Sequence, residues 1–374
     1  MMVGRIVKKK RSGGRRVREA RMFATAMKSA YHPVVAQIIP TRRCNLSCSY
    51  CNEYDDFSDP VDTAEMFRRI DKLAELGTTI ITASGGEPLL HPELPAIIGR
   101  VRSHGIMATL ITNGFPLTRK IIRDLNRAGL DYVQISIDNV IPDGASRKSL
   151  SLLDQKLQWL AEDAAFQVSI NAVLGEGIGN PADALTIARR ARELDFTATV
   201  GIIHDHRGQL RPLDESRQRI YKDILRMGAP IFSFAQYGLF QKNLVDGLPN
   251  QWHCRAGCRY LYICEEGLVH RCSQQRGIPG ISLGSYSRND LERESETAKK
   301  CTPFCTVSCV HQTALLDRFR ENPKAVLDQI TDSRKELDPS FKPPRLVGLL
   351  RRLFLNSRNR KLFGRIALRI LNIP

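Results

Sequence analysis

Short β-rich runs alternate with amphipathic helical stretches from Val34 onward, over about 170 residues. This alternation predicts parallel strands joined by crossover helices. We therefore expect an α/β fold, a partial (β/α)6 TIM-like barrel whose chemistry lies in the loops after the strands. The β-rich runs are 34–39, 79–84, 106–112, 131–138, 166–174 and 197–204, and the helical stretches between them are 62–76, 93–104, 118–128, 149–162 and 181–194.

The ten cysteines fall into two groups, three at positions 44–51 and seven at positions 254–309. A chain of 374 residues can bury a large core without disulfides. Grouped thiols in such a chain indicate metal sites in a reducing compartment. The sequence has neither a stretch apolar enough to span a membrane nor a secretory segment, so we predict a cytoplasmic protein.

The net charge of +17 comes from the two ends of the chain. Residues 1–30 contain ten Lys or Arg and one acid, and residues 339–374 contain nine Lys or Arg and no acid. The remaining residues, 31–338, carry a net charge of −1. The positive charge therefore lies at the two ends, which would attract a phosphate backbone but contain few aromatic residues to stack on bases, and we regard nucleic acid as an unlikely partner.

The C-terminal segment 346–373 has the periodicity of an amphipathic helix, with Arg, Lys and Asn on its polar face. A basic helix without acids suits an anionic membrane surface. This segment predicts peripheral attachment to the inner face of the membrane, and with it a lipid substrate. Packing of the same helix on the barrel is an equal alternative.

The first cysteine group, Cys44, Cys48 and Cys51, has the spacing C-x3-C-x2-C and directly follows the first β-rich run. Three thiolates can hold a four-iron cluster and leave its fourth iron open to another ligand. A zinc site or three structural cysteines are the alternatives.

The order CNLSCSYC, second strand, GGEP resembles the radical S-adenosylmethionine (SAM) superfamily, over residues 34–210. The resemblance implies that the three cysteines hold a 4Fe–4S cluster that binds SAM, with Tyr50 near the adenine. It also implies that the glycine-rich segment lies beside the methionyl amine; glycine permits close approach of the backbone and proline fixes the turn. That segment consists of Gly85, Gly86, Glu87 and Pro88.

Three polar residues at strand ends are further candidates. Ser136 and Asp138 end the fourth strand, where the resemblance implies contact with the ribose or the methionine carboxylate. Asn171 on the fifth strand points to the same end of the barrel if the strand alternates regularly. Strand-end caps or core polar groups are equal alternatives. His204 and Asp205, after the sixth strand, are candidates for substrate contact, or simply part of a polar loop.

The second cysteine group lies in a stretch that predicts a hairpin, CRAGCRYLYICEEGLVHRC, with EEG as its turn. It resembles SPASM or twitch domains, which implies one or two auxiliary clusters, although the closing spacing C-x3-C-x3-C departs from their pattern. Seven thiolates are one short of two fully protein-ligated clusters. Either one cluster keeps an open iron, or a histidine (His253, His270 or His311) completes it, or one cluster leaves three spare thiols. A zinc module is the other alternative. The cysteines are Cys254, Cys258, Cys264, Cys272, Cys301, Cys305 and Cys309.

The sequence thus predicts four segments: a basic extension (1–33), the barrel (34–240), the auxiliary cluster domain (241–315) and a basic helical tail (316–374). The resemblance implies reductive cleavage of SAM and hydrogen abstraction from a lipid or a peptide, with a flavodoxin or ferredoxin as electron donor. The alternative function is a non-catalytic binding module, stabilised by zinc or iron–sulfur and acting on nucleic acid or a membrane surface.

Overall fold

Six parallel strands form a curved sheet in the computed structural model, which describes residues 13–51, 53–175, 178–203, 210, 212–227, 238–337 and 339–343. Each strand pairs with the next along the chain, which confirms the predicted partial barrel. The strands are β1(Val35–Thr41), β2(Ile80–Gly85), β3(Met107–Thr112), β4(Tyr132–Ser136), β5(Gln167–Gly175) and β6(Thr197–Ile203).

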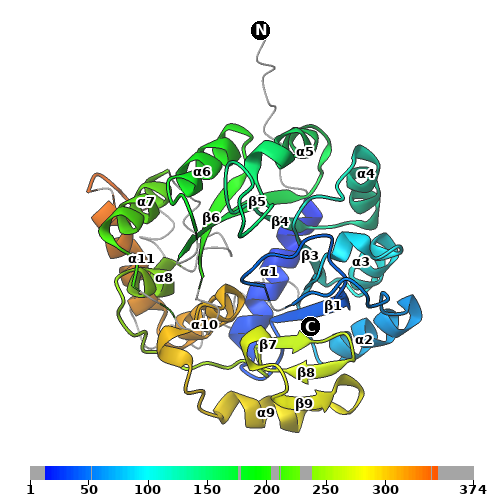
Figure 1. Cartoon of the computed structure of the whole chain (residues 1–374). Helices are drawn as coiled ribbons and strands as arrows, with labels where there is room; N and C mark the ends of the chain where they lie inside the picture. Colours follow the sequence, from blue (N-terminus) through cyan, green and yellow to red (C-terminus); the bar gives the residue numbers. More distant parts are fainter. Residues whose placement is uncertain are drawn as a thin grey trace.

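Helices cover the outer face of this sheet (Figure 1). Outward residues such as Ala36 and Ile38 of β1 pack in one buried cluster with Met66 and Ile70 of the first crossover helix. Alternate strand residues therefore point to the helices, as the period of a strand requires. These helices are α2(Thr63–Glu75), α3(Leu94–Ser103), α4(Arg119–Ala128), α5(Leu150–Asp163), α6(Asp183–Glu193) and α7(Glu215–Arg226).

Local signals in the sequence set several helix ends. The side chain of Asp62 accepts from the Glu65 N–H at the start of α2, and that of Thr118 accepts from the Ile121 N–H at the start of α4. Such caps satisfy backbone donors that the first turn leaves free. Helix α4 ends at Gly129, whose φ of +83° favours glycine.

A helix near the N-terminus, α1(Gly13–Lys28), packs against the inner face of the sheet at the N-terminal ends of the strands. Its Met22 and Ala26 are buried with Val35, Ile80 and Met107 from the beginnings of β1, β2 and β3. The sequence assigns this segment to a basic extension. Its described part contributes to the core, because Met22 and Ala26, one turn apart on the helix, are both buried.

Buried polar contacts hold α1 in place. Asp131, 2% exposed, accepts from Arg18 at 2.5 Å and from the Ala108 N–H at 3.1 Å. The next residue, Tyr132, donates its hydroxyl to Glu19. The carboxylate of Asp131 therefore ties α1 to strand β3.

The predicted hairpin extends the barrel sheet. β7(Tyr260–Ile263) lies parallel to β1, with Val35 opposite Tyr260, and is followed by antiparallel β8(Leu268–His270) and β9(Pro279–Ser282). The turn between β7 and β8 contains Gly267 with a φ of +80°, as the EEG turn predicts. The sheet order is β6-β5-β4-β3-β2-β1-β7-β8-β9, so the cysteine-rich segment shares one sheet with the barrel.

Further helices and 3-10 turns complete the described part of the chain. They are α8(Gly238–Val245), α9(Arg288–Glu296), α10(Ser308–Glu321), α11(Pro323–Leu337) and the 3-10 turns η1(Pro88–Leu90), η2(Ser273–Gln275), η3(Leu283–Ser285) and η4(Thr302–Phe304). The predicted tail helix 346–373, His204 and Asp205 lie outside the described residues. Among the residues that are described, no helix is both long and apolar enough to cross a membrane.

We expect Asp131→Asn to lower the free energy of unfolding by on the order of 3 kcal/mol, because it leaves the Arg18 guanidinium without its buried anion. Urea denaturation followed by circular dichroism measures this. Asp124→Asn, which removes a pair with Lys120 on the exposed face of α4, is the matched control and should unfold like wild type. Equal stability of the two variants would contradict the role assigned to Asp131.

Candidate functional site

The Cys44, Cys48 and Cys51 thiols converge in the loop after β1. The loop folds back on itself, because the Cys44 N–H donates to the Asp55 carbonyl at 2.9 Å and the Cys51 N–H to the Cys48 carbonyl at 3.0 Å. Burial raises the pKa of Cys44 and Cys51, and the neighbouring thiols raise it further. The three thiols of this loop therefore influence one another electrostatically.

The glycine pair after β2 packs directly against this loop. A Cβ atom at Gly86 would lie 2.1 Å from the Arg42 carbonyl oxygen and 2.4 Å from that of Arg43. Two hydrogen bonds seal the contact, from the Gly86 N–H to Thr41 and from the Glu87 N–H to Arg43. Glycine is therefore required here because the backbone just before Cys44 occupies the place of a side chain. The implied contact of this segment with the methionyl amine stays a prediction.

Glu87 links the second and third strand ends. Its fully buried carboxylate accepts from the Thr112 hydroxyl and the Asn113 N–H, both at 2.7 Å, and from the Leu89 N–H at 2.9 Å. Burial raises the pKa of Glu87 to about 7. Pro88 begins the turn η1 that follows. Glu87 is thus held by backbone and hydroxyl donors inside the protein, and it positions Asn113.

Asn113, which begins the NG pair after the third strand but is not among the predicted site residues, lies beside the first cysteine. Its amide donates to the Asn45 side chain at 2.8 Å and lies 3.7 Å from the Cys44 sulfur. The one available signal is its place at the end of the third strand, where parallel strands bring polar groups to a common edge.

A buried lysine joins Tyr50 to Asp138. The Lys148 ammonium lies 3.1 Å from Asp138, donates to the Tyr50 hydroxyl and stacks 5.0 Å from the Tyr50 ring centre. Tyr50 also donates to Asp138. Burial alone lowers the pKa of Lys148, but the attraction of Asp138 and Tyr50 raises it above its usual range. A permanent positive charge therefore lies beside Cys48 and Cys51, a charge that the sequence analysis missed.

Ser136 and Asn171 stand opposite each other in the pairing of β4 with β5. Both are partly exposed, and the side-chain amide oxygen of Asn171 accepts from the Thr199 hydroxyl at 3.0 Å. One carboxylate oxygen of Asp138 is buried without a hydrogen-bond partner in the described structure. These three residues thus lie at the same end of the barrel as the cysteine loop, and their contact with a cofactor stays a prediction.

Residues 38–211 match the family model described as the radical SAM superfamily, with the three thiols and the glycine pair inside the matched range. This part of the chain is a radical SAM domain. PqqA peptide cyclase of Xanthomonas oryzae pv. oryzae is 33% identical over 155 residues, 40% of this chain and 42% of the relative. Fe-coproporphyrin III synthase of Methanosarcina barkeri is 37% identical over 103 residues, 27% of this chain and 26% of the relative. The chain thus spans less than half the length of these curated relatives.

Two solved structures share the fold of this chain over a longer stretch than the radical SAM domain alone. Streptococcus suis SuiB bound to S-adenosylmethionine superimposes with a TM-score of 0.52 at 14% identity, covering 82% of this chain and 70% of SuiB. SuiB bound to its precursor peptide SuiA gives 0.50 at the same identity, covering 82% and 69%. The SAM and 4Fe–4S cluster predicted from the sequence are the cofactors of the radical SAM superfamily.

Four of the seven later cysteines gather beside the hairpin. Burial raises the pKa of the Cys305 thiol. Three neighbouring thiols, those of Cys254, Cys272 and Cys301, raise it further. Burial, followed by Cys254 and Cys301, raises the pKa of Cys272 to about 12. These residues are separated in the sequence by up to 51 positions.

The other three thiols face different surroundings. Cys258 donates to the Ala30 carbonyl at 3.6 Å beside Arg259, and Cys264 donates to the Glu266 carboxylate at 3.2 Å. Cys309 lies in the first turn of α10, where burial raises its pKa to about 11. Of the three histidines, His253 bonds the Ser295 carbonyl, His270 accepts from the Gly277 N–H, and His311 stacks on Phe240.

The sulfurs are not arranged as in a compact zinc site. A tetrahedral zinc with Zn–S bonds of about 2.3 Å needs sulfurs about 3.8 Å apart. Within the described residues, which include all ten cysteines, no three sulfurs lie within 4.8 Å of one another. The iron–sulfur interpretation of Cys44, Cys48 and Cys51 is supported by the family match of residues 38–211.

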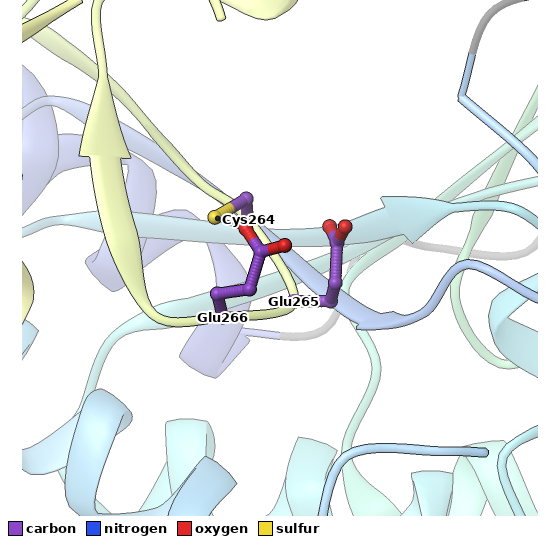
Figure 2. A group of neighbouring side chains, drawn as sticks. All are labelled: Cys264, Glu265 and Glu266. Atoms are coloured by element: carbon purple, nitrogen blue, oxygen red, sulfur yellow. Dashed lines mark hydrogen bonds between the residues drawn. The ribbon is translucent and has the colours of Figure 1, made fainter. Parts of the chain in front are cut away.

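The turn of the hairpin brings together Cys264, Glu265 and Glu266, whose ligand atoms lie within 4.8 Å of one another (Figure 2). Arg276 pairs with both carboxylates, and Arg42 lies 3.6 Å from Glu265. The two arginines already balance the negative charge that a divalent cation would require. We therefore interpret this turn as an ion-paired contact between the hairpin and the cysteine loop.

We expect Lys148→Met to lower the free energy of unfolding by about 3 kcal/mol, because Asp138, 1% exposed, loses its buried counter-charge. The double variant Lys148→Met/Asp138→Asn should recover part of that loss, since it leaves no unpaired charge. Thermal and urea unfolding of the single and double variants measures the coupling. Lys120→Met, on the exposed face of α4, is the matched control. Additive effects of the two substitutions would contradict the pairing.

Proposed function

We propose that the chain is a radical SAM enzyme that cleaves SAM reductively and abstracts a hydrogen atom from a peptide. The observation that carries the proposal is the convergence of Cys44, Cys48 and Cys51 at the C-terminal end of the barrel strands. The peptide is favoured over the lipid because two similar proteins are a peptide cyclase and a protein solved with a precursor peptide.

In this proposal the three thiolates hold three irons of a 4Fe–4S cluster, and SAM occupies the fourth. When bound, the cluster and SAM supply a 5′-deoxyadenosyl radical for the hydrogen abstraction. Lys148 balances the negative charge of the cluster or of the methionine carboxylate, and the unpartnered Asp138 oxygen accepts from a ribose hydroxyl. Glu87 fixes Asn113 beside Cys44, and α1 excludes water from the opposite end of the barrel.

The same proposal gives the later cysteines one auxiliary 4Fe–4S cluster, held by Cys254, Cys272, Cys301 and Cys305. Four thiolates leave no open iron, so this cluster would transfer electrons and not bind substrate. A flavodoxin or ferredoxin is the proposed electron donor. Membrane attachment through residues 346–373 stays a prediction of the sequence alone.

Anaerobic reconstitution with iron, sulfide, dithionite and SAM should yield 5′-deoxyadenosine, which chromatography with mass spectrometry detects. Cys44→Ala should abolish the product, because the cluster loses one of its three protein ligands. Cys264→Ala is the matched control and should keep the product, since that thiol faces Glu266 and not the other thiols. Absence of the product from the wild-type chain would overturn the proposal.

Iron analysis tests the assignment of the auxiliary cluster. The reconstituted chain should contain about eight irons, as two four-iron clusters require. Cys272→Ala should reduce the number to about four, whereas Cys258→Ala should leave it unchanged, since Cys258 bonds the Ala30 carbonyl. A loss of iron in Cys258→Ala, or about twelve irons in the wild type, would mean that the spare thiols are ligands.

A further inference from the structure

The inner face of the barrel is polar along its middle. In β4 the outward residues Val133 and Ile135 are buried among the helices, and Gln134 between them points inward. Corresponding inward positions on the other strands also carry amides and hydroxyls, and these side chains keep partial exposure: Gln37, Thr109, Ser169, Asn171 and Thr199. The middle of the inner face therefore carries partly exposed polar side chains, whereas inward residues nearer α1, such as Val35 and Met107, are apolar and buried.

The strands contribute no charge to this inner face, and the nearby Arg15 and Glu19 of α1 lie 3.9 Å from each other beside Tyr132. As the structure describes them, β1 to β6 contain no Asp, Glu, Lys, Arg or His. The charged residues of the site, Glu87, Asp138 and Lys148, all lie beyond the C-terminal ends of the strands. At the opposite end, Met22 and Ala26 of α1 close the barrel with apolar contacts.

Most of the inward polar groups hydrogen-bond to one another, but Gln134 and Ser169 have hydrogen-bonding atoms without a partner among the described residues. Gln37 accepts from Tyr260 at 2.6 Å, and the hydroxyls of Thr82 and Thr109 are 2.6 Å apart. Gln134 and Ser169 stand opposite each other in the pairing of β4 with β5. The Ser169 hydroxyl is buried without a partner, and the Gln134 amide has none among the described residues.

The cost of removing water from polar and charged groups decides which class of ligand such a surface can bind. A charged group would lose its hydration without meeting an unpaired counter-charge, since Arg15 and Glu19 already pair with each other. A hydrocarbon chain would take water from the Gln134 amide, at a cost of about 1–3 kcal/mol, and would leave the Ser169 hydroxyl without a partner as it is now. An uncharged amide both donates and accepts, as a glutamine and a serine do.

We propose that the inner face below Ser136 and Asn171 receives an uncharged, amide-bearing segment of the substrate, with Gln134 and Ser169 bonding its peptide groups. The inference rests on the proposed function, because it names the part of the peptide that enters the barrel. It requires that the residues around the reacting position carry no charged side chains.

Cysteine labelling tests the charge selectivity without any SAM chemistry. The tryptic peptide 128–147 has no native cysteine, so label found there in Gln134→Cys reports on position 134 alone. The iron–sulfur-loaded chain is treated with limiting neutral hydroxyethyl, cationic aminoethyl or anionic sulfonatoethyl methanethiosulfonate, with rates normalised to free cysteine. We expect the neutral reagent to react at least about tenfold faster than either charged one.

Equal rates for the three reagents, or no labelling by the neutral one, would overturn the proposal. Val133→Cys, which points to the helices, is the matched control and should stay unlabelled in the folded chain. Should Gln134→Cys fail to fold, Thr109→Cys takes its place, because the tryptic peptide 103–119 also lacks a native cysteine. Thr109 is partly exposed on the same inner face.

Protection from labelling identifies the class of ligand. N-acetylated, amidated hexapeptides of alanine and glutamine should slow the neutral reagent at least about fivefold, and the same peptides with glutamate or lysine should not. Equal protection by charged peptides, protection by anionic phospholipid vesicles only, or protection by none of these probes would overturn the inference. Because 5′-deoxyadenosine is measured separately, failure here differs from failure of the proposed function.

Discussion

The buried side chain of Arg259 joins parts of the chain that are far apart in the sequence. Its guanidinium donates to the carbonyls of Ala26 and Ser29 at the end of α1, and its Nε lies 3.1 Å from Asp317 on α10. Its own carbonyl accepts the Val34 N–H at 2.8 Å, just before β1. Burial, and then Arg259 itself, lower the pKa of the adjoining His32 to about 3, so that ring stays neutral and adds no competing charge.

Because Arg259 immediately precedes β7, it also sets how the cysteine-rich hairpin meets the barrel. β7 runs parallel to β1, so the C-terminal ends of both strands point to the same end of the sheet. There the Tyr262 hydroxyl donates to Glu53, two residues after Cys51, and Glu265 pairs with Arg42. The hairpin thus supports the cysteine loop directly, and the two thiol groups are parts of one framework.

The sequence predicts what depends on local pattern and misses what depends on distant pairing. Strand periodicity, the C-x3-C-x2-C loop and the EEG hairpin are local, and the structure has each of them. Lys148 meets Tyr50 across 98 positions, and no spacing rule connects them. The division of seven cysteines into four neighbours and three separate thiols depends likewise on how the hairpin folds. The burial of α1 was hidden by its high content of arginine, whose long side chains reach buried anions such as Asp131.

The distribution of reactive groups suits the carbon radical of the proposed function. A thiol would donate its hydrogen to such a radical, and all ten cysteines lie outside β1 to β6 as the structure describes them. The amides and hydroxyls that line those strands hold their hydrogens in far stronger bonds, and they carry no charge that would draw in water and ions. The outer faces of the same strands are apolar and packed against helices. One period-two pattern therefore serves two purposes: alternate residues build the core, and the residues between them form an unreactive inner surface that can still bind an amide.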